Sequence, residues 1–449
     1  MIHLGKGRPY RGFLQTFDGL WGSLGIVLSS NVVVSGLTFA TLVLTSRSLS
    51  PAGLGMLVMI EAYGRIFDQV LRLEPSQALI RQGTLHGHHP DDRPFRRLVK
   101  FGFMLDIGGS ILAGAVAICS LPLLVDWFGF TPDTTLLVVL FCLTLLVPAP
   151  MTSQAMLRLF DRFGLIARIH VATAVLRLAG TAGLWTIGGD LVHFVLLLCA
   201  VSIFERVLPT LICLPLLLRR CGHGIGRTGM AGLQAENEGL WRSVWAANLN
   251  VLARSSIRHF DVVALSGFVG PAEIGLYVLG KRFAMLLIRL GSPLQLVVYP
   301  RMCQFAAGRK LSEMVRFVAT LVACFAGLSA LGLLAFHLAG ADFVSRVFGA
   351  DFAAATPIIL VQLAGACLLL LATILNAALQ AVRREGQLLT VSVVAAVAFY
   401  APLPLLVPQH GVMGASFLYL LASAIVFFGC SVAFAAALRS EKRRSSVAG

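Results

Sequence analysis

The sequence predicts an all-α membrane protein with about twelve transmembrane helices, in two six-helix bundles that are related by a parallel internal repeat. Three observations support this prediction. Of the 449 residues, 57% are hydrophobic and 13% are charged, with a mean hydropathy of +0.85, which is too apolar for a soluble chain of this length. Apolar stretches follow one another almost from end to end. A short sequence pattern also recurs half a chain apart.

Each apolar stretch can cross a hydrocarbon core about 30 Å thick, for which a helix needs about 20 residues. The expected spans are 20–45, 54–80, 98–122, 134–157, 163–187, 190–218, 241–268, 275–300, 313–338, 352–381, 387–407 and 411–437. They divide the chain into an N-terminal six-helix lobe (1–219), a cytoplasmic linker (220–240) and a C-terminal six-helix lobe with a short basic tail (241–449).

Two sequence patterns occur once in each half at nearly the same offset. The first begins at Pro51 and returns 220 positions later at Pro271, and each copy has a glycine four residues on, Gly55 and Gly275. The second comprises Ala155, Leu157, Arg162 and Gly164, which return 222 positions later as Ala377, Leu379, Arg384 and Gly386. Two matches in the same register indicate a duplicated unit, an arrangement that lets two bundles rock about a shared site.

The net charge of +15 follows the expected topology of the chain. Of the 36 lysines and arginines, only Arg47 and Arg346 fall in the connections that follow odd-numbered spans. The termini and the connections that follow even-numbered spans are rich in both. Because cytoplasmic segments carry the excess of basic residues, we expect both termini in the cytoplasm. The basic clusters are expected to contact membrane lipids, and no nucleic-acid partner is expected.

Several motifs that could indicate an enzyme or a metal site are interpreted otherwise. The chain has no GxxxxGK[ST] phosphate loop, and Gly224, Gly226 and Gly229 are interpreted as part of a flexible linker. His86, His88 and His89 are interpreted as a solvated loop, because they have no fixed helical spacing. We therefore expect a protein that is not an enzyme and that holds no metal or cofactor.

A charged stripe runs along the second expected span. Glu61, Arg65, Asp68 and Arg72 lie at i, i+4, i+7 and i+11, which places them within an arc of about 60° on a helix. Each charge at the bilayer centre costs about 2.5–3.5 kcal/mol, so all four should face the bundle or an aqueous cavity. Two interpretations stay open. The stripe lines a transport pathway, or it neutralises itself through the pairs four residues apart.

Basic residues outnumber acidic ones inside the expected spans, so a cavity that they share would be positively charged. Guanidinium groups bind phosphates through paired, charge-assisted hydrogen bonds, which favours an anionic, phosphate-bearing substrate. The candidate substrate-binding residues are Arg65, Arg72, Arg177, Arg254, Arg258, Lys281, Arg282 and Arg289. The candidate residues for coupling to H⁺ or Na⁺ are Glu61, Asp68 and Asp261.

The sequence resembles the polysaccharide transporters of the multidrug, oligosaccharidyl-lipid and polysaccharide exporter superfamily over most of its length. The motifs that carry the resemblance are Asp261 with Pro271, Ala272, Glu273, Gly275, Tyr277, Lys281, Arg282, Tyr299 and Pro300; Ser46 to Leu49; Phe348, Gly349 and Phe352; and Gly411, Gly414 and Ala415. The charged second span, with Glu61 to Arg72 and Glu74, departs from the family's weakly charged pattern.

The resemblance implies a two-lobed transporter of the bacterial cytoplasmic (inner) membrane. It would flip an undecaprenyl-diphosphate-linked oligosaccharide by alternating access, with a polysaccharide polymerase and glycosyltransferases as possible partners. The main alternative is an ion-coupled drug or metabolite antiporter of the same superfamily, which the excess of intramembrane cations disfavours. A further alternative is a scaffold that recruits glycan-assembly enzymes, for which buried charges on several helices would have little purpose.

Overall fold

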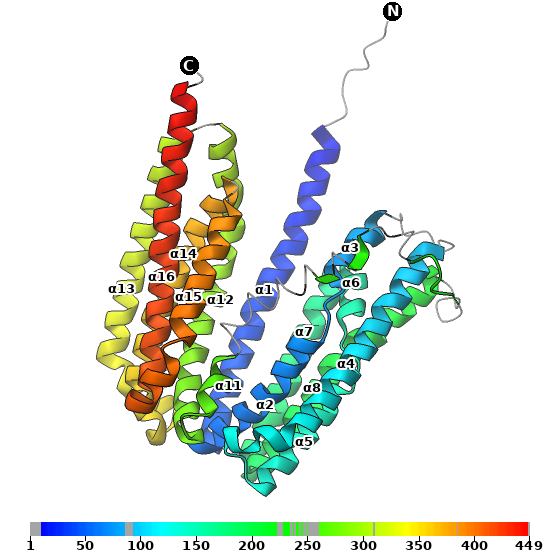
Figure 1. Ribbon diagram of the computed structural model, residues 1–449, viewed down its shortest axis with the longest axis vertical. Coiled ribbons are helices and arrows are strands. Elements are labelled where there is room, and N and C mark those ends of the chain that lie inside the picture. Colours follow the sequence, from blue (N-terminus) through cyan, green and yellow to red (C-terminus); the bar gives the residue numbers. More distant parts are fainter. Residues whose placement is uncertain are drawn as a thin grey trace, which may run out of the picture.

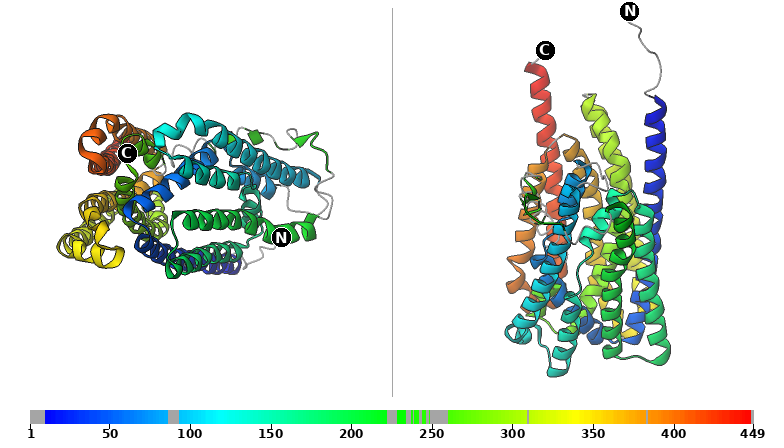
Figure 2. Two further views of the ribbon diagram at one scale, coloured as in Figure 1. Left: turned by 90° about the horizontal axis from the view of Figure 1, so that it is seen from below. Right: turned by 90° about the vertical axis from the view of Figure 1, so that its right-hand side faces the viewer.

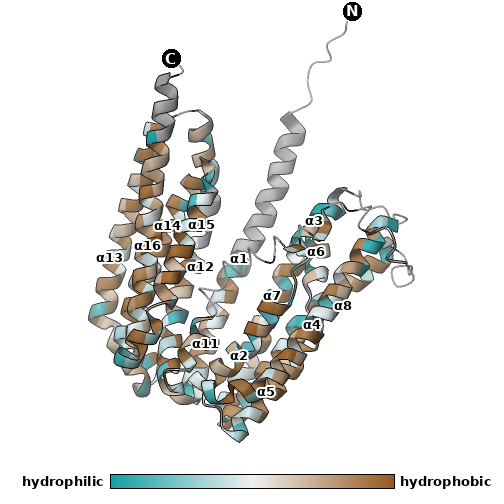
Figure 3. Cartoon of the chain, in the orientation of Figure 1, coloured by the Kyte–Doolittle hydropathy of each residue, from teal (hydrophilic) through white to brown (hydrophobic). Residues whose placement is uncertain are grey.

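A computed structural model describes residues 10–85, 93–221, 228–233, 237, 239–241, 244–245, 248, 260–308, 310–382 and 384–447. Every regular element in this part of the chain is a helix, which confirms the predicted all-α fold. Seven described helical stretches are long and apolar enough to cross a membrane. Apolar residues cover most of the length of α4, α5, α8, α13 and α16 (Figure 3).

The helices fall into an N-terminal and a C-terminal group. The N-terminal group comprises α1 (Tyr10–Ser48), α2 (Pro51–Leu71), α3 (Ser76–Leu85), α4 (Arg93–Phe128), α5 (Pro132–Leu145), α6 (Met151–Leu159), α7 (Phe163–Ile187) and α8 (Leu191–Cys221). The C-terminal group comprises α11 (Asp261–Ser266), α12 (Pro271–Ala307), α13 (Leu311–Phe348), the 3₁₀ helix η2 (Ala350–Ala355), α14 (Thr356–Ala381), α15 (Glu385–Tyr400) and α16 (Leu403–Val447).

The two groups meet at one end and diverge toward the end where the chain termini lie (Figure 1). Helix α1 runs between them and packs along α7, while α12 packs against α14 in its own group and against α2 in the other. The view from below separates α13 to α16 from α4 to α8 in the same way (Figure 2). We call the end where the groups meet the sealed end, and the two groups the N-lobe and the C-lobe.

The repeated Pro-to-Gly pattern forms the closest contact between the lobes. Pro51 and Pro271 each begin a helix at its first turn, α2 and α12, where a proline costs no hydrogen bond. A Cβ atom built on Gly55 would lie 1.7 Å from the Pro271 carbonyl oxygen, and one built on Gly275 would lie 2.0 Å from the Pro51 carbonyl oxygen. The contact is reciprocal, as across a two-fold axis, and only glycine lets the two backbones approach so closely.

Polar contacts surround this glycine contact at the sealed end. Arg47, in the last turn of the N-lobe helix α1, donates hydrogen bonds to the carbonyls of Arg346 and Val347, the latter at 2.8 Å, and so caps the C-terminus of α13. The Trp127 indole of α4 donates to the Val263 carbonyl at 3.1 Å and its ring covers Gly267. These bonds cross from one lobe to the other, so the sealed end is held by polar contacts as well as by packing.

Two expected spans are each broken into two helices. The second span ends at Leu71 and resumes as α3 at Ser76, one residue after Pro75, so that Glu74 lies in the break and not inside a span as expected. The fourth ends at Leu145 and resumes as α6 at Met151, after Pro148 and Pro150. Proline lacks an amide hydrogen and disfavours helix in the residue before it, which ends each helix at these points.

The remaining expectations for the C-lobe are met with shifted boundaries. The eleventh expected span ends as α15 at Tyr400, and the chain begins α16 at Leu403, before the expected twelfth span. Gly411 sits inside α16 with φ of 57° and ψ of −149°, a kink that glycine adopts without strain. Most of the seventh expected span lies outside the described residues, which cover α11 at its end.

Candidate functional site

A cavity opens between the lobes, with walls from α1, α2, α7, α8 and α12. Its charged lining residues are Glu61 of α2, Arg177 of α7, and Arg282 and Arg289 of α12. Three arginines against one carboxylate make the described lining positively charged. The apolar lining residues are Phe39, Leu42, Leu54, Leu57, Val58, Phe194, Leu197, Leu198, Val278, Met285 and Leu286.

Helix α1 contributes a row of hydroxyl groups to the cavity. Ser35, Thr38, Thr41 and Thr45 lie three or four residues apart, so they share one face of the helix, and all four line the cavity. Thr38 and Thr41 donate to the carbonyl four residues earlier, at 2.7 and 2.8 Å. This bond satisfies each hydroxyl hydrogen inside the helix and leaves the oxygen as an acceptor toward the cavity.

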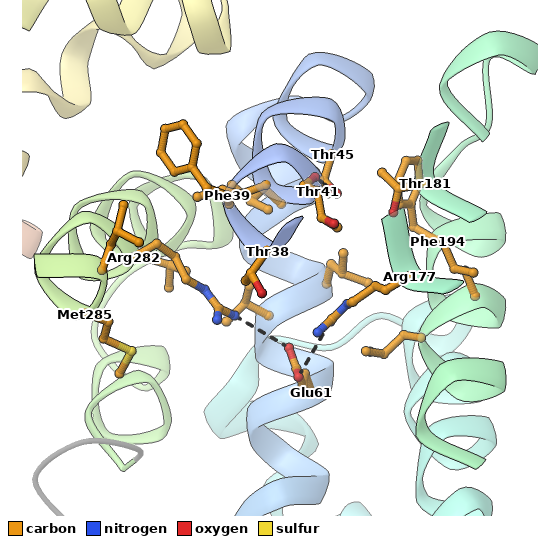
Figure 4. A pocket seen from close by; sticks show the side chains of 18 of the residues that line it. Thr38, Phe39, Thr41, Thr45, Glu61, Arg177, Thr181, Phe194, Arg282 and Met285 are labelled. Carbon is orange, nitrogen blue, oxygen red and sulfur yellow. Dashed lines mark hydrogen bonds and ion pairs between the residues drawn. The ribbon is translucent and has the colours of Figure 1, made fainter. Parts of the chain in front are cut away.

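Glu61 lies where three arginines from three helices converge; Figure 4 shows two of them, Arg177 and Arg282. Arg65, one turn along α2, places Nη2 2.8 Å from Glu61 Oε1 and donates a hydrogen bond to the same oxygen from Nε at 2.9 Å. Arg177 approaches the same carboxylate to 3.8 Å from the N-lobe, and Arg282 approaches to 4.0 Å from the C-lobe. Glu61 is 7% exposed, so this cluster joins both lobes around one buried carboxylate.

Asp68 and Arg72 serve a different region of the N-lobe. Asp68 pairs with Arg72 at 2.9 Å and with Arg206 of α8 at 2.9 Å. Arg206 also donates at 3.1 Å to the Val147 carbonyl, in the break that follows α5. The predicted pairs Glu61 to Arg65 and Asp68 to Arg72 are thus both confirmed. The first pair adjoins the cavity, whereas the second supports the broken fourth span.

Asp106 holds the other side of this break and was not among the predicted site residues. Its carboxylate oxygen Oδ2 accepts a hydrogen bond at 2.8 Å from the backbone N–H of Thr152, at the start of α6. Asp106 is 1% exposed. A carboxylate at a helix N-terminus satisfies amide hydrogens that have no partner within the helix. Asp106 and Arg206 therefore stabilise the two free helix ends that the prolines create.

Asp261 and Lys281 form a buried pair in the C-lobe, away from the cavity lining. Lys281 Nζ lies 2.5 Å from Asp261 Oδ1, and the Tyr277 hydroxyl donates to Asp261 Oδ2 at 3.0 Å. The Asp261 side chain is 4% exposed and that of Lys281 is 16% exposed. The pair joins α11 to the middle of α12, so its first effect is to position these two helices.

Replacing Asp261 by alanine is expected to destabilise the protein by about 3–5 kcal/mol, because the Lys281 ammonium group would stay buried without a partner. The double variant Asp261→Ala, Lys281→Met is expected to regain most of this loss, since it removes the unpaired charge. Thermal unfolding of the purified protein in detergent measures both. Equal stability of the single and double variants would contradict a structural role for the pair.

The structure separates the predicted substrate-binding residues into distinct groups. Arg177, Arg282 and Arg289 line the cavity, Arg65 contacts it through Glu61, and Arg72 and Lys281 are paired with acids elsewhere. Arg254 and Arg258 lie outside the described residues, as do His86, His88 and His89. Where the chain is described, no three His, Cys, Asp or Glu side chains gather in a group that could hold a metal ion.

The row of hydroxyls on α1 was missed, although the sequence carried a signal for it. Serine and threonine at positions 35, 38, 41 and 45 follow helical periodicity within an otherwise apolar span. The prediction relied on charged residues alone. The row requires no charge, because the hydroxyls of Thr38, Thr41 and Thr45 donate within their own helix and so tolerate the membrane.

Comparison with known proteins adds a family and two structural relatives. The family model described as "Polysaccharide biosynthesis protein" matches residues 20–306. Among curated proteins, the inner membrane protein YghQ of Escherichia coli (strain K12) is 25% identical over 327 residues, which cover 72% of this chain and 91% of that protein.

Two solved structures share the fold over nearly the whole chain. The lipid II flippase MurJ, in an inward closed conformation, superposes with a TM-score of 0.68 at 11% identity and covers 95% of this chain and 90% of its own. An inward-facing multidrug resistance transporter of the MATE family, from the MOP superfamily, superposes with a TM-score of 0.63 at 11% identity and covers 93% of this chain and 95% of its own. The chain has the fold of a multi-pass membrane transporter.

Proposed function

This chain belongs to the polysaccharide biosynthesis protein family, and on that premise we propose that it flips a polyprenyl-diphosphate-linked oligosaccharide across the bacterial cytoplasmic membrane by alternating access. The observation that carries the proposal is the positively charged cavity between the lobes, to which Arg177 contributes from one lobe and Arg282 from the other. In this proposal the chain is a transporter and not an enzyme. YghQ, a relative from an inner membrane, supports the location.

The cavity walls match two of the three parts of such a substrate, the diphosphate and the sugars. Arginines donate paired, charge-assisted hydrogen bonds to a diphosphate. The hydroxyl oxygens of Thr38 and Thr41 can accept hydrogen bonds from sugar hydroxyls. The polyprenyl chain stays in the lipid, because transferring it into a charged cavity would forfeit its burial among apolar chains. The arginines fix the headgroup, and the adaptable hydroxyl row suits an oligosaccharide.

The direction of transport follows from the proposed orientation of the chain. Arg93, Arg96, Arg97 and Lys100 lie at the start of α4, on the side of the chain termini, where the lobes diverge (Figure 1). The distribution of basic residues supports placing that side in the cytoplasm. The cavity then takes up its substrate from the inner leaflet, and the sealed end faces outward. Opening that end would release the glycan outside.

A small-molecule antiporter is the second candidate, favoured by the shared fold of the MATE transporter. An organic cation would need acids that are free to bind it. Among the described lining residues Glu61 is the only acid, and three arginines already surround it. The lining therefore favours an anion over a cation.

Coupling to H⁺ or Na⁺ is part of the proposal, with Glu61, Asp68 and Asp261 as its candidates. Each of them lies within 4.0 Å of a basic side chain. A coupling cation must therefore displace an arginine or lysine from its carboxylate. We also propose a polysaccharide polymerase and glycosyltransferases as partners, because they would consume and supply this substrate.

Deleting the gene is expected to make the polyprenyl-diphosphate-linked oligosaccharide accumulate on the cytoplasmic face and to remove the extracellular polysaccharide. Lipid extraction with mass spectrometry identifies the sugar unit, and a leaflet-restricted glycan probe locates it. Restoring the gene is the control. Unchanged polysaccharide with no accumulation of the lipid would overturn the proposed substrate and favour the antiporter.

A further inference from the structure

The cavity already contains an anion of its own, the carboxylate of Glu61. It is the only acidic side chain among the described lining residues, and it lies between Arg177 and Arg282 (Figure 4), with Arg65 one turn along its own helix. A diphosphate that binds Arg177 and Arg282 must share these arginines with Glu61. The cavity is therefore not an open anion site. It is an anion site in which one negative charge is built into the wall.

The distances divide the three arginines into two kinds. Arg65 donates a hydrogen bond to Glu61 from Nε at 2.9 Å and places Nη2 2.8 Å from the same oxygen, whereas Arg177 at 3.8 Å and Arg282 at 4.0 Å are beyond hydrogen-bonding distance. Arg177 and Arg282 are thus attracted to the carboxylate without being hydrogen-bonded to it. Their side chains are each 33% exposed, so a ligand in the cavity can reach both.

We propose that Glu61 is an internal competitor of the substrate's diphosphate, which sets how tightly the cavity holds its cargo and so determines how readily the cargo leaves. This inference rests on the proposed function. Two arginines in a cavity of low dielectric could hold a diphosphate too tightly for turnover. A fixed carboxylate beside them repels the ligand's negative charge and lowers its affinity. It also replaces the ligand as counter-ion when the ligand departs.

The position of Glu61 between the lobes adds a reason for this role. Arg177 belongs to the N-lobe and Arg282 to the C-lobe, and α2 lies between their helices at this point (Figure 4). Any movement of one lobe against the other changes the distance between the two arginines. It therefore also changes whether a diphosphate can contact both arginines or only one. Glu61 is the anion that can pair with the arginine which the ligand releases.

The test is the binding of inorganic pyrophosphate to the purified full-length protein in detergent, measured by calorimetry. Glu61→Gln should bind at least about tenfold more tightly than the wild type, because the repelling charge is gone while a partner for Arg65 remains. Its rate of flipping should fall, because release becomes slower. Glu61→Asp keeps the charge and should bind within about threefold of the wild type.

Asp342→Asn is the control for net charge, because it removes one negative charge at an exposed position of α13 outside the cavity lining. Its affinity for pyrophosphate should equal that of the wild type. If the wild type binds pyrophosphate and Glu61→Gln binds it equally or more weakly, the role of Glu61 is overturned and the proposed function stands. If the wild type does not bind and Arg282→Gln makes no difference, the anion site itself is wrong, and the proposed function fails with this inference.

Discussion

Replacing Gly275 by leucine is expected to reduce transport by about tenfold or more while leaving the amount of protein in the membrane unchanged. A Cβ atom at Gly275 would lie 2.0 Å from the Pro51 carbonyl oxygen, which is backbone and cannot move aside by changing rotamer. The lobes would have to separate at the sealed end. Overpacking of this kind costs about 1–3 kcal/mol, which shifts the balance between two states by about 5- to 150-fold.

The control for this variant is Gly36→Leu, because a Cβ atom at Gly36 of α1 meets nothing within 4 Å. It should transport as the wild type does. A cysteine at Thr45, in a background without the native cysteines, should react faster with an impermeant thiol reagent added from the sealed end when Gly275 is leucine. Wild-type transport and labelling in Gly275→Leu would mean that the glycine contact plays no part in sealing this end.

Replacing Arg282 by glutamine is expected to reduce diphosphate affinity by about two orders of magnitude, and transport with it. Removing one partner of a buried, hydrogen-bonded charge pair costs about 2–5 kcal/mol, and each 1.4 kcal/mol is a factor of ten. Arg282 is the C-lobe arginine that reaches toward the shared carboxylate, and Arg177 is its counterpart in the N-lobe. Losing Arg177 would remove the N-lobe arginine of the described lining, and losing Arg282 would leave Arg289 as the C-lobe arginine of that lining, so either loss should weaken the grip of one lobe on a diphosphate.

The matched control is Arg301→Gln, an exposed arginine on the same helix that does not line the cavity. Flipping of a polyprenyl-diphosphate oligosaccharide in vesicles measures both variants. We expect a large loss of flipping for Arg282→Gln and none for Arg301→Gln. Equal rates for the two would remove Arg282 from the substrate site.

The sequence was sufficient to predict the helical architecture of the chain but not the breaks within its helices. Hydropathy and the repeat predicted a two-lobed helical transporter, and the family resemblance drawn from scattered motifs is confirmed. Hydropathy did not detect the break near Pro148, because Leu146, Val147 and Ala149 beside it are apolar. It did not detect the break near Pro75 either, because the few polar residues there were averaged with the apolar residues of the same expected span, 54–80. Proline ends a helix through a missing hydrogen and a steric clash, to which an average over apolar residues is insensitive.

The charges of α2 show why the site was only partly predictable. Helical periodicity placed Glu61 and Asp68 on one face, as one stripe. The two residues are seven positions apart, which is about 10 Å along a helix, so they contact different neighbours. Glu61 meets Arg177 and Arg282 at the cavity, and Asp68 meets Arg206 behind it. Periodicity gives the direction of a side chain but not the helix that it meets.

The most direct test of the central claim is flipping by the purified protein in vesicles of defined lipid. A fluorescent polyprenyl-diphosphate oligosaccharide is placed in one leaflet, and its arrival in the other is followed by a membrane-impermeant quencher. We expect translocation that depends on the protein, is lost in Arg282→Gln and is inhibited by excess inorganic pyrophosphate. Translocation no faster than in empty vesicles, from a preparation that shows a folded thermal transition, would contradict it.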